Sequence, residues 1–163
     1  MVTKKNIHLY LDDVRIPNDD RWEVVANYDE FVNHLNLHDL SDYEVISFDH
    51  DLGTSAMAEY FRNVRPNGII DYDNISEKTG LDCAKFLVQK AINEKTPLPK
   101  VYCHSANPVG TANIVNYLNS YLQNCESEER CRIAKIEHGF RPLSDEEKAE
   151  RSKVYRIKDI RIK

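Results

Sequence analysis

The stretch Glu44-Val45-Ile46-Ser47-Phe48-Asp49-His50-Asp51-Leu52-Gly53 decides the fold. It starts as a short, mostly apolar run and ends in two carboxylates that flank an imidazole, followed by a glycine. Such a run is typical of a buried strand, because strands of a parallel sheet are covered on both faces and lose the apolar/polar alternation. We therefore expect a strand over residues 44–48. Its charged end would lie at the carboxyl edge of the sheet, where open α/β sheets bind ligands.

Two other apolar stretches end in polar side chains in the same way. Residues 7–11 run into Asp12 and Asp13, and residues 100–103 run into His104. These residue types suit metal or phosphate chemistry. Three such endings in one short chain, separated by helical patterns, indicate one shared site.

Strand and helix patterns alternate along the chain. The expected strands are 7–11, 22–26, 44–48, 100–103 and 130–136, and the expected helices are about 30–37, 79–93 and 110–122. This alternation predicts an α/β fold with helices on both faces of a parallel five-stranded sheet, a three-layer sandwich of flavodoxin type. In the strand order 2-1-3-4-5, the first, third and fourth strands are neighbours, so their polar ends would meet at the switch point of the sheet.

Two segments do not fit this alternation. Residues 54–78 contain chain breakers and scattered aromatic residues, and we interpret them as an inserted segment of the kind that forms lids or binding loops. Residues 141–163 form a basic C-terminal extension. Lysines and arginines on a terminal strand more often prevent pairing at an exposed sheet edge than bind a nucleic-acid backbone. We expect a single domain over residues 1–163, with its core at about 6–140.

The composition is that of an ordinary soluble domain. The chain has 163 residues, 30% of them charged, and its net charge of −5 gives no general attraction to nucleic acid. It has no apolar run of membrane-spanning length, no signal-peptide core at its start and no C-x-x-C spacing among its four cysteines. We therefore expect a cytoplasmic protein with reduced thiols and no membrane contact. Motifs of nucleotide triphosphatases, dinucleotide oxidoreductases and serine hydrolases are missing from the sequence.

Four motifs together resemble a known family. They are Leu-Asp-Asp-Val-Arg-Ile-Pro from residue 11, Ser-Phe-Asp-His-Asp-Leu-Gly from residue 47, Thr-Gly-Leu-Asp from residue 79 and His-Ser-Ala-Asn-Pro-Val-Gly from residue 104. The acidic pair, Asp49 and Ser105-Ala106 are similar to the conserved positions of response-regulator receiver domains. The whole set looks like the receiver-like domains of bacterial and phage proteins that are proposed to process cyclic phosphates. The resemblance covers roughly residues 6–122 and implies a receiver-like fold.

The chain also departs from ordinary receivers. These carry a Lys-Pro pair after the fifth strand, and neither Lys135 nor Arg141-Pro142 fits that position well. His50 and His104 are not receiver residues. Imidazoles beside a carboxylate cluster favour turnover of a phosphoryl group over its storage, so the departures argue against phosphorelay signalling.

Four carboxylates are candidates for a metal site: Asp12, Asp13, Asp49 and Asp51. Converging carboxylates repel one another unless a cation lies among them, and Mg²⁺ or Mn²⁺ prefers such oxygen ligands. The resemblance implies that Asp13 and Asp49 hold the metal and that the residue at 51 adds a ligand. The alternative is that Asp12 or Asp51 only caps a helix or turns the chain.

His104, followed by His50, is our candidate for general acid and base, because imidazole titrates near neutral pH. The alternative for each histidine is a structural hydrogen bond. Asp49 is a third catalytic candidate through a covalent aspartyl phosphate, a route we favour less. Three residues are candidates for binding phosphate: Ser105, Asn107 and Arg15. Helix capping is the alternative for the first two, and pairing with the aspartates is the alternative for the arginine.

These observations predict a metal-dependent phosphoesterase that acts on a cyclic or terminal phosphate of a nucleotide or RNA end. The alternative is a catalytically inactive receiver-like module that binds a phosphorylated ligand or a protein partner. Loss of turnover in a folded Asp49→Asn variant would separate the two hypotheses.

Overall fold

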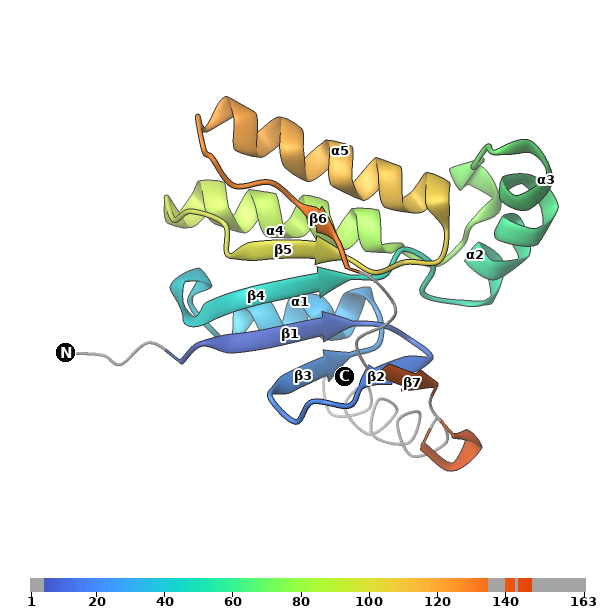
Figure 1. Ribbon diagram of the computed structural model, residues 1–163, viewed down its shortest axis with the longest axis horizontal. Coiled ribbons are helices and arrows are strands. Elements are labelled where there is room, and N and C mark those ends of the chain that lie inside the picture. The colour runs from blue at the N-terminus through green and yellow to red at the C-terminus, as the bar shows by residue number, and fades with distance from the viewer. Residues whose placement is uncertain (1–4, 135–139, 143, 148–163) are drawn as a thin grey trace, which may run out of the picture.

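The computed structural model describes residues 5–134, 140–142 and 144–147, and a parallel sheet lies at its centre. The strands are β1 (Ile7–Leu11), β3 (Trp22–Val25), β4 (Tyr43–Phe48), β5 (Lys100–Cys103) and β6 (Arg132–Ile133). They pair in the order β3-β1-β4-β5-β6 (Figure 1). The predicted α/β fold and the predicted order 2-1-3-4-5, counted over the strands of this sheet, are confirmed.

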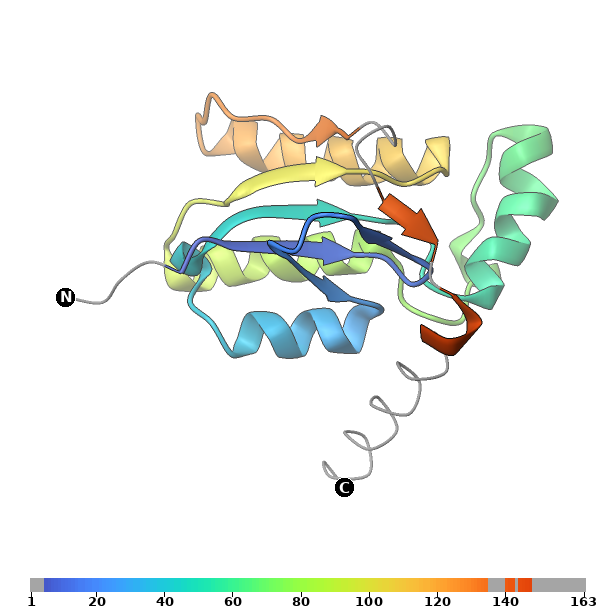
Figure 2. The same cartoon turned by 60° about the horizontal axis from the view of Figure 1, so that its bottom comes forward.

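The long helices α1 (Tyr28–Asn36), α4 (Gly80–Glu94) and α5 (Pro108–Asn124) connect successive strands of this sheet. Each crossover advances in the same direction across the sheet, so right-handed connections place all three helices on one face (Figures 1 and 2). Apolar side chains from that face of the strands and from the helices form the buried core, among them Leu9, Ile46, Phe48, Phe31, Leu87 and Ile114. We predicted helices on both faces of the sheet. Among the described residues, the long helices lie on this face only.

Two short strands form a second, antiparallel sheet. Strand β2 (Arg15–Pro17) pairs with β7 (Phe140–Pro142), so the link from β1 to β3 contains a strand that is not among the predicted ones. Strands of three residues are too short to show periodicity, which is why the sequence did not predict them. The predicted fifth strand is also shorter than expected, and residues 135 and 136 lie outside the described residues.

The inserted segment 54–78 is largely helical, although its chain breakers gave no helical pattern in the sequence. It contains α2 (Thr54–Glu59), the π-helical turn η2 (Tyr60–Val64), α3 (Arg65–Asn67) and the 3-10 turn η3 (Tyr72–Asn74). Buried Glu59 accepts hydrogen bonds from the Asn63 side chain, the Asp71 amide and the Asn74 side chain at 2.8–2.9 Å. The segment therefore closes on itself, and it stands at the carboxyl end of the sheet (Figure 2).

The C-terminal extension is described only in part. Ser144 and Glu147 form a capping box, since each backbone amide donates to the other residue's side chain at 3.1 Å. The alternating residues 154–163 lie outside the described residues. Among the helices that the structure describes, none combines the length and the apolar character needed to cross a membrane.

Candidate metal and phosphate site

Three neighbouring strands end at the same level of the sheet. Leu11 pairs with Phe48, and Phe48 pairs with Cys103. The residues that follow continue the hydrogen-bond ladder, because the Asp49 amide donates to the Leu11 carbonyl at 3.0 Å and the His104 amide donates to the Phe48 carbonyl at 2.9 Å. The expected meeting of these strand ends at one edge is confirmed.

Three carboxylates converge at this edge. One oxygen from each of Asp12, Asp13 and Asp49 lies within 4.8 Å of the others. Asp12 and Asp49 are buried and Asp13 is partly buried. The Asp51 carboxylate, which we predicted as a fourth ligand, does not belong to this group. The three carboxylates offer oxygen ligands of the kind that Mg²⁺ and Mn²⁺ prefer.

Burial and mutual repulsion give these carboxyl groups unusual acidities. Burial first, and then the charge of Asp12, raise the pKa of Asp49 well above its usual value. The same two causes raise the pKa of Asp13 to about 6. Burial alone would also raise the pKa of Asp12, but the hydrogen bond from His104 and the charge of Arg15 lower it. Two of the three carboxylates therefore carry their charge at a cost that a bound cation would relieve.

Asp12 is held by several donors. Its Oδ1 accepts the backbone amides of Val14 and Arg15, each at 2.9 Å, and its Oδ2 accepts the Arg15 side chain at 2.9 Å. His104 Nε2 adds a further contact to Oδ2 at 3.2 Å. An ionised carboxylate offers about four acceptor positions, so these contacts fill Asp12. Asp12 therefore has little acceptor capacity left for a metal.

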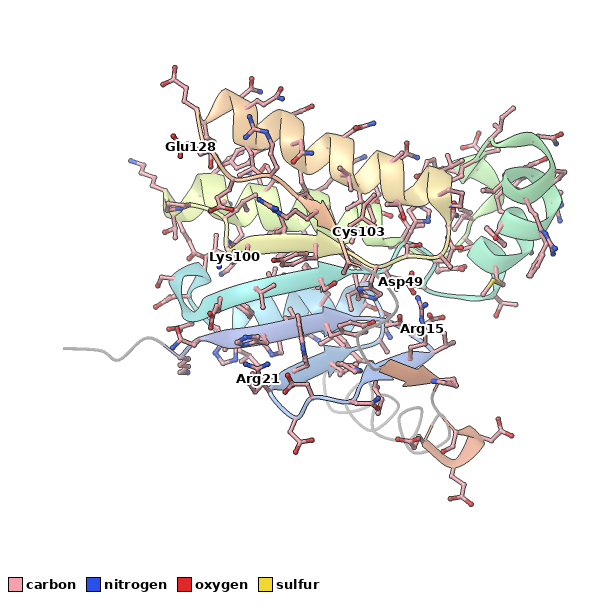
Figure 3. The ribbon with its side chains drawn as sticks, in the orientation of Figure 1. Arg15, Arg21, Asp49, Lys100, Cys103 and Glu128 are labelled. Atoms are coloured by element: carbon pink, nitrogen blue, oxygen red, sulfur yellow. The ribbon has the colours of Figure 1, made fainter. Side chains whose placement is uncertain are left out.

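Arg15 brings a positive charge into the carboxylate cluster. Its side chain pairs with Asp12 and also lies 3.8 Å from Asp49 Oδ1, and the two carboxylates raise the pKa of the guanidinium despite its burial (Figure 3). Arg15 therefore pairs with the aspartates, which is the alternative we considered for it. Its guanidinium also lies beside the candidate metal site. Its predicted role in binding phosphate stays a prediction.

His104 lies beneath the cluster with both ring nitrogens engaged. The side chain is 1% exposed, its Nδ1 is 2.7 Å from the Ser47 hydroxyl, and its ring stacks on Tyr10 at 4.0 Å between centroids. Burial lowers its pKa, so the imidazole is neutral. Since ionised Asp12 can only accept, Nε2 donates to Asp12 and the Ser47 hydroxyl donates to Nδ1. This geometry makes His104 a support for Asp12, while its predicted acid–base role stays a prediction.

His50 is enclosed by a second hydrogen-bond network. Its Nδ1 donates to Asp51 Oδ1 at 2.6 Å, and its Nε2 is hydrogen-bonded to the Tyr72 hydroxyl at 3.0 Å. Asn113 in turn donates to the Tyr72 oxygen at 2.8 Å, and Asn107 donates to the Asp51 carboxylate at 3.2 Å. The Asp51 side chain therefore orients His50. Tyr72 was missed in the sequence, because it lies in the inserted segment and belongs to no motif.

Two glycines allow helices to approach this network closely. A Cβ atom on Gly80 would lie 1.7 Å from the Asp49 carbonyl oxygen, and one on Gly110 would lie 2.4 Å from Cγ of His50. The Gly80 amide donates to the His50 carbonyl at 2.8 Å, which ties the start of α4 to the site. Asp82 closes a capping box with Thr79 at the same helix start, so its role here is structural.

Ser105 and Asn107 shape the start of α5. Asn107 is the N-cap, since its Oδ1 accepts the Gly110 amide at 2.9 Å. The Ser105 oxygen accepts the Asn107 amide at 3.1 Å and its hydroxyl can still donate. The Asn107 oxygen is thus used for helix capping, which is the alternative we considered. Ser105 is better suited than Asn107 to donate a hydrogen bond to a phosphate oxygen. Both predicted phosphate contacts stay predictions.

The fold and the acidic site define a receiver-like α/β domain. A family model described as the cyclic-phosphate processing receiver domain matches residues 7–120, so the chain belongs to this family. The match includes the aspartate cluster, both histidines and the inserted segment, and it ends before β6. Neither the curated proteins nor the solved structures that were compared contain a match to the chain.

Proposed function

We propose that this domain is a metal-dependent phosphoesterase that acts on a cyclic or terminal phosphate of a nucleotide or RNA end. The convergence of Asp12, Asp13 and Asp49 is the observation that carries the proposal. Membership of a family associated with cyclic-phosphate processing supports the choice of substrate.

Asp13 and Asp49 would hold Mg²⁺ or Mn²⁺, because the Asp12 oxygens are already engaged by Arg15, His104 and backbone amides. A divalent ion bound there would supply positive charge against the negative charge that develops on a phosphoryl group in the transition state. Asp12 fixes the Arg15 guanidinium beside the same position. The guanidinium and the Ser105 hydroxyl would then orient the phosphate oxygens.

The two histidines support the carboxylates in this proposal. The His104 ring donates to Asp12, and the backbone amide of His50 donates to Asp49 Oδ1 at 2.8 Å, while the His50 ring donates to Asp51. Either ring would have to give up a hydrogen bond before it could move a proton.

That last observation also favours the second candidate function, a module that binds a phosphorylated ligand without turnover. With both imidazoles engaged, the site offers candidate metal ligands and phosphate donors, but His50 and His104 would each have to break a hydrogen bond to transfer a proton. Such a module would bind the phosphorylated compound in the presence of metal and release it unchanged.

The test is hydrolysis of 2′,3′-cyclic mononucleotides and of a short RNA with a cyclic end, in Mg²⁺ or Mn²⁺ and in EDTA. Turnover that requires the metal, is lost in Asp13→Asn and Asp49→Asn, and persists in Asp20→Asn would support the enzyme. Asp20 is an exposed aspartate outside the cluster, which makes it the matched control. Thermal stabilisation by metal and ligand without hydrolysis would instead support the binding module.

A further inference from the structure

A pocket lies on the sheet face opposite the long helices. Its volume is about 330 Å³, and its walls include Tyr10, Trp22, Val45, Ser47, Tyr102 and His104. These residues come from β1, β3, β4, β5 and the turn after β5. The pocket is therefore separate from the carboxylates at the sheet edge, although His104 contributes to both.

The register of the strands explains why this face is hollow. Tyr10 pairs with Ser47, and Ser47 pairs with Tyr102, so the smallest side chain of the row stands between two large aromatic ones. Neighbouring strands lie about 4.8 Å apart, which places the two tyrosine backbones roughly 9.6 Å from each other. Val45, two residues before Ser47, extends the floor on the same face. The result is a trough over Ser47 and Val45 whose accessible aromatic wall is Tyr102, because Tyr10 is 4% exposed and its ring stacks on His104.

Trp22 completes the wall on the β3 side. Its ring meets the Tyr10 ring edge to face, with centroids 5.6 Å apart, and both Trp22 and Tyr102 are partly exposed. Aromatic side chains on strands are the usual platforms on which bases stack, because every base presents a π face.

The trough also carries polar groups at its floor and rim. The Ser47 hydroxyl donates to His104, which leaves the lone pairs of its oxygen to accept a further hydrogen bond. Exposed Glu44 and Lys100 stand at the rim, so one acceptor and one donor flank the opening (Figure 3 labels Lys100). This combination suits a ring that contains nitrogen and presents both donors and acceptors.

We propose that this pocket binds a flat nitrogen heterocycle of nucleobase size. Its volume is at the low end of the range for small-molecule sites, which fits one ring system. An α-helix with its side chains is about 10–12 Å across and is too wide for the trough. The proposal does not depend on the phosphoesterase function, since the pocket shares only His104 with that site.

Trp22 is the single tryptophan of the chain, so its fluorescence reports directly on this pocket. The full-length protein would be titrated with adenosine, guanosine, ribose and inorganic phosphate. The proposal expects saturable quenching by at least one nucleoside and none by ribose or phosphate. Equilibrium dialysis of the same nucleoside supplies a measure of binding that does not rely on fluorescence.

Two variants alter the trough in opposite ways. Tyr102→Leu removes a stacking wall and Val45→Phe fills the floor, and each should weaken nucleoside binding about tenfold or more, given the size of base stacking. Tyr60→Leu is the matched control. It replaces a partly buried tyrosine of the inserted segment by leucine and should leave nucleoside binding unaltered. Circular dichroism would verify that each variant is folded.

Two results would overturn the proposal. One is the lack of saturable binding of either nucleoside to the wild-type protein, as expected if the trough is filled by the chain itself or takes a different ligand. The other is binding that survives both trough variants, because the heterocycle would then occupy a different part of the molecule.

Discussion

Consecutive aspartates at the end of β1 should have opposite effects on stability. In EDTA at neutral pH, Asp13→Asn should stabilise the fold and Asp12→Asn should destabilise it. The reason is that burial and the charge of Asp12 raise the pKa of Asp13 to about 6, whereas hydrogen bonds and Arg15 lower the pKa of Asp12. The two substitutions are identical in chemistry and adjacent in sequence, so each is the control for the other.

The size of the Asp13 effect follows from its pKa. A rise from 3.8 to about 6 corresponds to about 3 kcal/mol at about 1.4 kcal/mol per unit. Because the side chain is partly exposed, solvent reduces this to about 1–2 kcal/mol. For a chain of this length, 1 kcal/mol changes the melting temperature by about 2–4 °C, so Asp13→Asn should melt several degrees above wild type.

The Asp12 substitution should cost more than the Asp13 substitution gains. It weakens charge-assisted hydrogen bonds to Arg15 and to buried His104, which are worth about 1.5–3 kcal/mol each, and it leaves the guanidinium with one anionic partner fewer. We expect a loss of about 2–4 kcal/mol in urea unfolding at neutral pH.

The pH dependence gives a further check on the signs. A carboxyl whose folded pKa is raised loses its proton more readily in the unfolded state than in the folded state. Ionisation of Asp13 therefore lowers the free energy of unfolding as pH rises from about 4 to about 6. A carboxyl whose folded pKa is lowered contributes stability above its unfolded pKa, and that of Asp12 is lost as pH falls below about 4. The advantage of Asp13→Asn over wild type should therefore vanish near pH 4. Equal signs for the two variants at neutral pH would refute this account of the site.

Three further outcomes follow from the same contacts. Gly80→Ala should lower the free energy of unfolding by about 3 kcal/mol in urea, because its Cβ meets the Asp49 carbonyl oxygen. Gly53→Ala should cost about 1 kcal/mol, because its Cβ meets the Glu77 side chain, which can move by weakening its hydrogen bonds to Ser55 and Ala56. Tyr72→Phe should lower the melting temperature by about 2–4 °C through loss of its contacts to His50 and Asn113, with Tyr60→Phe as the control, and an unaltered midpoint would contradict the network. Mg²⁺ should raise the melting temperature of wild type but not of Asp49→Asn, and equal shifts in both would place the metal elsewhere.

The sheet could be predicted because its information is local. Each of the runs at 7–11, 44–48 and 100–103 shows burial in its own composition, and the polar residue after each run marks where the strand leaves the core. The inserted segment could not be predicted in the same way. Its helical pieces are short, a π-helical turn and Pro66 interrupt them, and buried Glu59, which ties them together, has the appearance of a surface residue in the sequence.

The roles of the individual site residues could not be predicted from the sequence, for a different reason. The two histidines and four aspartates are visible in the sequence, but their roles depend on partners that are distant along the chain. Ser47 and Asp12 settle the tautomer of His104, from 57 and 92 positions away, and Tyr72 meets His50 only because the inserted segment folds back to the sheet edge. Motif spacing can therefore indicate which residues gather at the site. It cannot distinguish Asp12, whose pKa is lowered by its donors, from Asp13 and Asp49, whose pKa values are raised by burial and by the charge of Asp12. That difference makes Asp13 and Asp49 the pair on which metal binding should depend.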